Sequence, residues 1–240
     1  MHFIKTAIVT GGSSGIGKSI CFELVKNGYE VINFDKKRFT SKNIHFYKTN
    51  LEKLTSIKKN FLSASKKFKH ICVLVNNAAI TISNNFKDYS IQDWNKTLLV
   101  NLHAPYYLTQ LFANMLIKKK EKGSIVNITS IGAELAFPNN PAYQASKAGL
   151  KHLTKSISYD LSKFKIRANN IVPGYTESGM NVKSWKNKKL RKERSNRSML
   201  NRWAKPNEIS KAVIFLISDN SSFITGTDLV VDGGWISKGM

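Results

Sequence analysis

The sequence is short of acidic residues and has little cysteine. Its 240 residues include 15 Asp and Glu against 38 Lys and Arg, which gives a formal net charge of +23. The two cysteines, Cys21 and Cys72, form no Cys-x-x-Cys motif, so we expect neither a disulfide framework nor a metal site. No apolar run reaches the roughly 18 residues that a membrane-spanning helix needs.

Disorder is excluded as the main state, because 42% of the residues are hydrophobic and 10% are aromatic. A chain of this length suits one domain, and we expect a single domain over residues 1–240. The segment from Met1 to Lys5 runs into a strand-like stretch and lacks the core of a signal peptide. These features predict a cytoplasmic protein.

The positive charge would attract polyanions, which brings nucleic acid and anionic membranes into consideration. Lysines are spread along the whole chain and asparagine is abundant, which indicates a compositional bias. We therefore expect neither a nucleic-acid nor a membrane partner. One segment is locally basic and contains Glu193 as its only acid. Its basic residues are Lys183, Lys186, Lys188, Lys189, Arg191, Lys192, Arg194, Arg197 and Arg202.

Short β-prone runs alternate with stretches of helical periodicity along the chain. The predicted strands are Lys5–Thr10, Tyr29–Phe34, Ile44–Tyr47, Ile71–Val75, Ser124–Ile128, Ile166–Val172 and Asp228–Val231. The later helices are expected at Ile91–Lys118, Ala142–Leu161 and Asn207–Ile217. The pattern predicts an α/β fold, a doubly wound parallel sheet of about seven strands with helices on both faces. The gap between the second and third strands is too short for a full helix.

A glycine-rich turn follows the first predicted strand and precedes a helix. Gly11, Gly15 and Gly17 lie where missing Cβ atoms would let a pyrophosphate approach backbone N–H groups and the helix N-terminus. The alternative is a structural turn without a ligand.

Asp35 follows the second predicted strand. A carboxylate there can accept hydrogen bonds from both adenosine ribose hydroxyls and repels the 2′-phosphate of NADP, which favours NAD(H). Lys36, Lys37 and Arg38 come next and are suited to a 2′-phosphate, so NADP(H) stays open. The other interpretation of Asp35 is a solvated turn acid.

Tyr143 and Lys147 are four residues apart on a predicted helix, which places both side chains on one face. A tyrosine usually ionises near pKa ~10, and a neighbouring ammonium favours the phenolate, so Tyr143 could exchange a proton with a substrate oxygen. In isolation the pair would more often be a surface pair. Ser130, at the end of a predicted buried strand, adds a hydroxyl that could hold the same oxygen.

These motifs together resemble the short-chain dehydrogenase/reductase family, in its branch of about 250 residues. The segment Thr10–Gly17 is similar to the family's Thr-Gly-x-x-x-Gly-x-Gly turn, and Asn76–Ala79 to its Asn-Asn-Ala-Gly element, with Ala79 in place of Gly. Pro173–Gly174 and Val231–Gly234 match two further elements. The resemblance covers nearly the whole chain and implies a Rossmann fold.

The resemblance also implies roles for individual residues. Tyr143 would be the general acid/base. Lys147 would lower the pKa of Tyr143 and bind the nicotinamide ribose, while Ser130 would orient the substrate oxygen and Asn101 would hold a water in a proton relay. The implied cofactor residues are Gly11, Ser13, Ser14, Gly15, Ile16, Gly17, Asp35, Asn50, Leu51, Asn77, Ala78, Ala79, Tyr143, Lys147, Pro173, Gly174, Thr176 and Ser178.

Three further positions, beside Ala79, depart from the family's common pattern. Asn50 stands where the family often has Asp, and Ser178 where many members have Thr. Ser14 stands where NADP-dependent acyl-carrier reductases of the family commonly have Arg, which supports NAD(H).

The segment 175–206 lacks clear periodicity, and in the family the corresponding segment covers the substrate. Beside Ser130 and Tyr143, the candidate substrate residues are Glu134, Tyr175, Met180 and Trp185. The basic residues of this lid would favour an anionic substrate; the alternative is a solvated helix face.

The leading hypothesis is an oxidoreductase that transfers a hydride between NAD(H) and a secondary alcohol or ketone. The alternative enzyme is an NADPH-dependent reductase of 3-oxoacyl groups on acyl-carrier protein or CoA. The alternative class is a catalytically silent nucleotide-binding or nucleic-acid-binding protein. The resemblance further implies a homotetramer or dimer, paired through the helices at 91–118 and 142–161.

Overall fold

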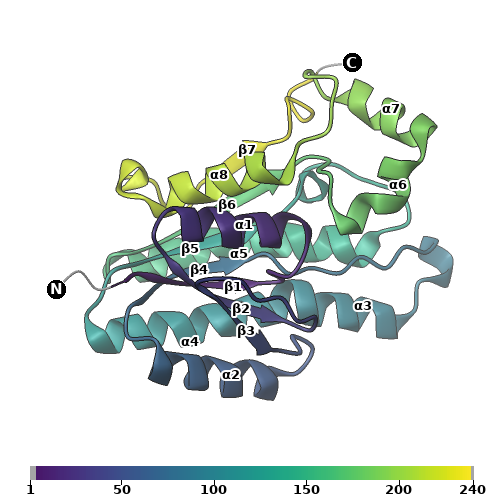
Figure 1. Ribbon diagram of the computed structural model, residues 1–240. Helices are drawn as coiled ribbons and strands as arrows, with labels where there is room; N and C mark the ends of the chain where they lie inside the picture. Colours follow the sequence, from purple (N-terminus) through teal and green to yellow (C-terminus); the bar gives the residue numbers. More distant parts are fainter. Residues whose placement is uncertain (1–3, 239–240) are drawn as a thin grey trace.

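One parallel sheet forms the centre of the protein (Figure 1). The computed structural model describes residues 4–238; Met1 to Phe3, which lead into the first predicted strand, lie outside the described residues. The strands are β1 Thr6–Thr10, β2 Glu30–Asp35, β3 Ile44–Lys48, β4 Ile71–Asn76, β5 Gly123–Ile128, β6 Ile166–Pro173 and β7 Asp228–Val231. Their order is β3-β2-β1-β4-β5-β6-β7, with every neighbouring pair parallel. The order reverses between β1 and β4, the place where such sheets bind ligands at their carboxyl ends.

Helices cover both faces of the sheet, as the sequence predicts (Figure 1). On one face α1 packs against α8, and on the other α2 packs against α4, while α5 lies against β6. Their bounds are α1 Gly15–Lys26, α2 Leu54–Lys67, α4 Ala104–Lys119, α5 Pro141–Ser162 and α8 Pro206–Ile217. No helix lies between β2 and β3, as expected from the short connection.

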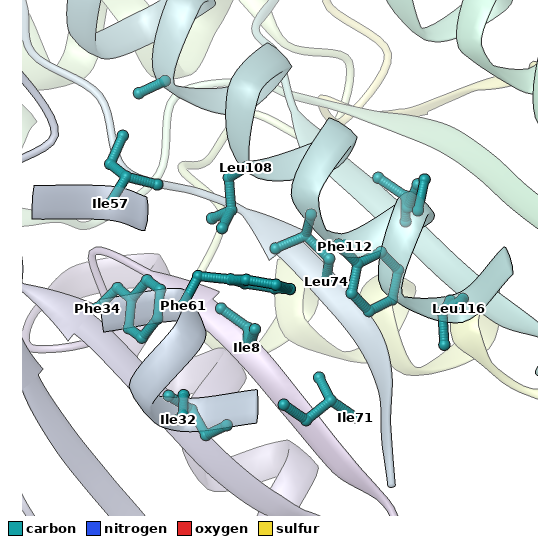
Figure 2. Close-up of a cluster of buried hydrophobic side chains, with 14 of the residues drawn as sticks. Ile8, Ile32, Phe34, Ile57, Phe61, Ile71, Leu74, Leu108, Phe112 and Leu116 are labelled. Atoms are coloured by element: carbon teal, nitrogen blue, oxygen red, sulfur yellow. The ribbon is translucent and has the colours of Figure 1, made fainter. Parts of the chain in front are cut away.

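The core between the sheet and the α2 and α4 helices is built from aromatic and branched side chains (Figure 2). Phe61 of α2 and Phe112 of α4 meet Ile8 and Leu74 from the two central strands. Full burial of side chains of this size stabilises the fold by about 1.5–3 kcal/mol each. The central strands are therefore held firmly, and so are the residues at their carboxyl ends.

The helix that the sequence predicts over 91–118 is interrupted. It divides into α3 Ile91–Leu98, a π-helical turn Leu99–His103 and α4. A π-helical turn holds one residue more than the α-helical repeat allows, a feature that the periodicity of apolar residues does not reveal. Asn101 lies within this turn and is fully buried.

The segment 175–206 contains helices that the sequence did not indicate. They are a 3₁₀ turn at Gly179–Asn181, α6 Val182–Lys186 and α7 Lys188–Arg197. In α7 only Leu190 is apolar, so no apolar stripe marked the helix. Its start is set by Asn187, whose side-chain oxygen accepts the backbone N–H of Leu190 at 3.0 Å.

A row of hydrogen-bonded polar side chains crosses the sheet from β4 to β7. Asn76, Asn127, Asn170 and Asp228 occupy paired positions on successive strands. The amide of Asn76 donates to Asn127 at 2.8 Å, and the amide of Asn170 donates to Asp228 at 2.8 Å. Thr154 of α5 links the two halves, at 2.8 Å from Asn127 and 2.7 Å from Asn170. This polar ladder satisfies groups that would otherwise be costly to bury, except the side-chain oxygen of Asn76, which has no partner among residues 4–238.

The cysteines lie in the kinds of element that the sequence predicts. Cys21 is buried in α1 and Cys72 is half-buried in β4. Within residues 4–238, no helix is both long and apolar enough to cross a membrane.

Candidate active site

The glycine turn brings the end of β1 against the start of α1. Gly11 and Gly15 have φ of +69° and +53°, a conformation that glycine adopts without strain. A Cβ on Gly17 would lie 2.1 Å from the carbonyl oxygen of Gly11, so a side chain there is excluded. Ser14 precedes the helix but makes no side-chain capping bond. The first N–H groups of α1 thus form an uncapped, electropositive end that suits a pyrophosphate.

Asp35 is at the carboxyl end of β2, beside this turn. One carboxylate oxygen accepts the backbone N–H of Ser13 and the other that of Lys37, each at 3.0 Å. Each oxygen keeps a lone pair for a further donor. Lys36, which follows Asp35, forms an ion pair with Glu52.

Asn33 is a positioning residue that the sequence analysis missed. It is fully buried, its side-chain oxygen accepts the N–H of Gly12 at 3.0 Å, and its amide donates to the hydroxyl of Ser13 at 3.0 Å. The available signal was a polar residue within the apolar run of β2.

The segment after β4 is fastened to the end of β1. The hydroxyl oxygen of Thr10 accepts the N–H groups of Asn77 and Ala78, both at 3.0 Å, and the amide of Asn77 donates to the carbonyl of Thr10 at 2.9 Å. Ala78 lies against Gly11, whose added Cβ would come within 2.9 Å of the Ala78 Cα. Ala79 follows this clamp and is half-buried.

Asn50 and Leu51 follow β3, which lies next to β2. Leu51 is buried, and the side-chain oxygen of Asn50 accepts the N–H of Glu52 at 3.0 Å. Asn50 therefore shapes the turn at the β2 edge of the candidate cofactor site.

The segment after β6 closes over the glycine turn. A Cβ on Gly174 would lie 2.8 Å from the Cα of Asp232, which explains the glycine that follows Pro173. Thr176 is buried and its hydroxyl donates to the carbonyl of Gly174 at 3.1 Å. Ser178 lies 3.2 Å from the position of a Cβ built on Gly15. Ile16 packs into the core beneath this turn.

Ser130, Tyr143 and Lys147 come together at the carboxyl end of β5. Lys147 is buried, and its Nζ donates to the carbonyl of Ile128 at 2.6 Å and lies 5.9 Å from the centre of the Tyr143 ring. Tyr143 and Ser130 share a hydrogen bond. The Ser130 hydroxyl also accepts the N–H of Gly132 at 3.0 Å, which fixes its position.

Burial dominates the electrostatics of this group. It lowers the pKa of Lys147 to about 7. It raises the pKa of Tyr143, against the lowering effect of the Ser130 hydrogen bond, and the nearby Tyr175 adds to the rise. Lys147 is not among the groups that shift the pKa of Tyr143 in this structure, so the expectation that it lowers this pKa stays a prediction.

The side chain of Asn101 ties the π-helical turn to the segment after β4. Its oxygen accepts the N–H of Ile80 and its amide donates to the carbonyl of Ile80, both at 2.9 Å, and to the hydroxyl of Ser146 at 3.1 Å. Both amide hydrogens are thus in use. A water held by Asn101 would have to bind to an oxygen atom of this residue.

The residues present fit a bound dinucleotide. The uncapped start of α1 and the glycine turn leave room for its phosphates, and Asp35 offers acceptors to a ribose. The ammonium of Lys147 has three N–H donors, of which one is bonded to Ile128, so two are available to ribose hydroxyls.

Comparison with known proteins decides the family. A family model described as enoyl-(acyl carrier protein) reductase matches residues 11–236. The chain belongs to the short-chain dehydrogenase/reductase family. It is therefore an oxidoreductase with an NAD(P)-binding Rossmann fold.

Relatives in this family differ in the substrates that their names state. L-xylulose reductase of Caenorhabditis elegans is 34% identical over 239 residues, covering 96% of this chain and 95% of that protein. The 3-oxoacyl-[acyl-carrier-protein] reductase FabG of Thermotoga maritima is 33% identical over 243 residues, covering 97% and 98%. The solved 4-hydroxyisoleucine dehydrogenase complexed with NADH has a TM-score of 0.93 and 30% identity, covering 98% and 100%. A second solved structure, that of a putative 2-deoxy-d-gluconate 3-dehydrogenase from Agrobacterium tumefaciens, contains bound NADP.

In this short-chain dehydrogenase/reductase, the candidate substrate residues lie in different surroundings. Glu134 forms an ion pair with Lys151 of α5, which also lies 3.6 Å from Asp228. Met180 is exposed in the 3₁₀ turn before α6. Tyr175 is half-buried in an aromatic cluster, and its ring centre lies 6.3 Å from Phe137, 5.1 Å from Trp235 and 5.0 Å from Trp203.

Trp185 borders a separate pocket of about 490 Å³. The pocket is lined by Glu177, Trp185, Arg191, Ser195, Asn201, Arg202, Trp203, Lys205, Asn207, Glu208 and Lys211. None of Ser130, Tyr143 and Lys147 lines it. Of the predicted substrate residues in the lid, Tyr175 is the one that acts electrostatically on Tyr143, whereas Trp185 lines this separate pocket.

Proposed function

We propose that the protein transfers a hydride between NAD(H) and a secondary alcohol or ketone, with Tyr143, Ser130, Lys147 and Asn101 as its acid/base group. The observation that carries this proposal is the meeting of Tyr143, Ser130 and Lys147 at the carboxyl end of β5, beside the glycine turn. When bound, the nicotinamide supplies or accepts the hydride.

Each side chain has a defined task in this proposal. The Tyr143 hydroxyl gives its proton to the substrate oxygen during reduction and takes it back during oxidation. The Ser130 hydroxyl holds the same oxygen, so that the substrate lies within reach of Tyr143. Lys147, with a pKa lowered to about 7 by burial, binds the nicotinamide ribose and can exchange a proton near neutral pH.

The preference for NAD(H) over NADP(H) rests on the surroundings of Asp35. Its carboxylate would face a 2′-phosphate and repel it, and Lys36 is engaged by Glu52. Ser13 holds one of the carboxylate oxygens in place. Lys37 and Arg38 are the residues that could reverse this preference.

A second candidate is an NADPH-dependent reductase of 3-oxoacyl groups on acyl-carrier protein or CoA. The FabG relative supports it, because its identity of 33% is almost the same as the 34% of the xylulose reductase. The basic lid segment 183–202 would suit such an acidic carrier. Asp35 argues against this candidate.

The test follows NADH and NADPH absorbance with a panel of ketones, secondary alcohols and a 3-oxoacyl thioester, using the wild type and Tyr143→Phe. We expect turnover of ketones or alcohols with NADH, reduced about 10²- to 10⁴-fold in the variant, with unchanged NADH binding. Turnover of the thioester with NADPH alone would establish the second candidate. Absence of any turnover, together with salt-dependent binding of a polynucleotide, would overturn both.

A further inference from the structure

Three arginines of α7 lie over a row of aromatic rings. Arg191, Arg194 and Arg197 recur at intervals of three residues and therefore share one side of the helix. Their guanidinium carbons lie 4.9 Å from the Trp185 ring centre, 4.5 Å from that of Tyr175 and 5.9 Å from that of Trp235, respectively. In Figure 1, α7 forms the upper right corner of the molecule, far from α2 and α4. These cation–π contacts dock α7 on the aromatic cluster.

Arg194 differs from Arg197 and Arg202 because it forms no ion pair with an acidic side chain that the structure describes. Arg197 lies 3.6 Å from Glu193, and Arg202 forms a bidentate ion pair with Glu208. In the part of the chain that the structure describes, Arg194 has neither a carboxylate within ion-pair distance nor a hydrogen-bond acceptor for its guanidinium. It is nevertheless half-buried. A cation in this position lacks the partner that partial burial favours.

The donors of Arg194 are not used by other described residues. Its guanidinium carbon lies 4.5 Å from the centre of the Tyr175 ring, and none of its N–H groups has an acceptor among residues 4–238. A planar carboxylate can therefore bind to Arg194 through two parallel hydrogen bonds.

Arg194 belongs to the surroundings of the candidate active site. Tyr175 packs with Phe137, Trp235 and Ile131, and Ile131 directly follows Ser130. Burial raises the pKa of Tyr175, and the charges of Arg194 and Arg197 oppose this rise. Tyr175 in turn contributes to the raised pKa of Tyr143. The separate pocket of about 490 Å³ is lined by Arg191 but not by Arg194.

We propose that Arg194 binds a carboxylate group of the substrate, so that the enzyme acts on hydroxy acids or keto acids. This inference rests on the proposed function. One guanidinium without an acidic partner balances the single charge of a carboxylate, while a phosphate dianion would require a second unpaired cation. Of the other two arginines on this side of α7, Arg197 already has Glu193 beside it, and Arg191 is exposed and lines the separate pocket.

The first experiment compares hydroxy acids of increasing chain length, each paired with its methyl ester, in the wild type, Arg194→Met, Arg194→Lys and Lys192→Met. We expect Arg194→Met to lower kcat/KM for the preferred acid about 10- to 100-fold, mainly through KM, and to leave the ester within about threefold. The kcat/KM of Arg194→Lys for the acid should lie between those of the wild type and Arg194→Met, because lysine keeps the positive charge but lacks the planar guanidinium. Lys192 is exposed on the same helix, so Lys192→Met controls for a general loss of positive charge.

The second experiment measures binding without turnover, using succinate and its neutral diamide in the presence of NADH. Trp203 and Trp235 both lie against Tyr175, so tryptophan emission should report on occupancy. We expect a saturable response to succinate that Arg194→Met abolishes, and none to the diamide. Equal losses for acid and ester would show that Arg194 only docks α7, and tighter binding of a phosphate ester would overturn the carboxylate assignment. Succinate binding that depends on Arg194, without any turnover of alcohols or ketones, would refute the proposed function and the acid substrates, and would support only the carboxylate site at Arg194.

Discussion

Asn33 accepts the backbone N–H of Gly12, so a fully buried residue of β2 fixes the position of the glycine turn. We predict that Asn33→Ala lowers the free energy of unfolding by about 1–3 kcal/mol, because it leaves the Gly12 N–H buried without a partner. The displaced turn should also weaken NADH binding. Urea unfolding and NADH fluorescence titration measure the two effects. Asn60→Ala, which removes a similar amide from α2, should leave NADH binding unchanged. Unaltered NADH affinity in Asn33→Ala would contradict the positioning role.

Asp35 should set the cofactor preference. We predict that Asp35→Ala weakens NADH binding at least about tenfold, because a charged acceptor for the ribose hydroxyls is lost. NADPH binding should stay the same or improve, since the repulsion of its 2′-phosphate is removed. Fluorescence titration of both cofactors at fixed salt measures this. Glu30→Gln removes a carboxylate from the other end of the same strand, where it lies beside His45, and serves as the control. Tighter binding of NADPH than of NADH by the wild type would show that Lys37 or Arg38 dominates.

Lys147 should make stability depend on pH. Its pKa is about 7 in the folded protein against 10.5 for a free lysine side chain, so between these values the unfolded chain binds a proton that the folded form does not. The free energy of unfolding then rises with pH by about 1.4 kcal/mol per pH unit from this group. We predict that Lys147→Met is more stable than the wild type at pH 7 and that the difference shrinks toward pH 9. Urea unfolding of both proteins at several pH values below 9 tests this. Above pH 9 the buried Cys21, whose pKa is raised to about 12, acts in the opposite direction. A constant difference between the two proteins would show that Lys147 stays charged.

The polar ladder should couple β6 to β7. We predict that Asn170→Ala destabilises the protein by about 1–3 kcal/mol, because the Thr154 hydroxyl loses an acceptor and the Asp228 carboxylate loses a donor. Combined with Asp228→Ala, the loss should be smaller than the sum of the single losses, since both changes break the same bond. Unfolding of the single and double variants by urea measures this coupling. Additive losses would show that the two residues act independently.

The strand pattern and the site motifs could be predicted because each leaves a local signal. The run at Ile71–Val75 is entirely apolar, as strands covered on both faces are, and it lies within the observed strand β4. Tyr143 and Lys147 are one helical turn apart, so their common direction follows from spacing alone. Their meeting with Ser130 needed only the expectation that β5 ends beside α5.

What could not be predicted depends on contacts between distant segments. The helix α7 has almost no apolar residues that could mark it in the sequence. Its arginines instead dock on aromatic rings that belong to other segments. The pKa of Lys147 depends on the depth of its burial, which no local pattern reveals. The ion pair of Glu134 with Lys151 likewise joins a loop to a helix. The compartment and the oligomeric state stay predictions from sequence.

The π-helical turn at Leu99–His103 changes the phase of the helix in which it lies. One additional residue rotates all later side chains by about 100° around the axis. This offset lets α3 pack against α5 while α4 packs against α2, although the two helices are continuous. A single-residue deletion here would restore a regular helix but turn one of its halves away from its partner. The same deletion in an exposed loop would destabilise the fold far less. The packing of α3 and of α4 therefore fixes the number of residues in this turn.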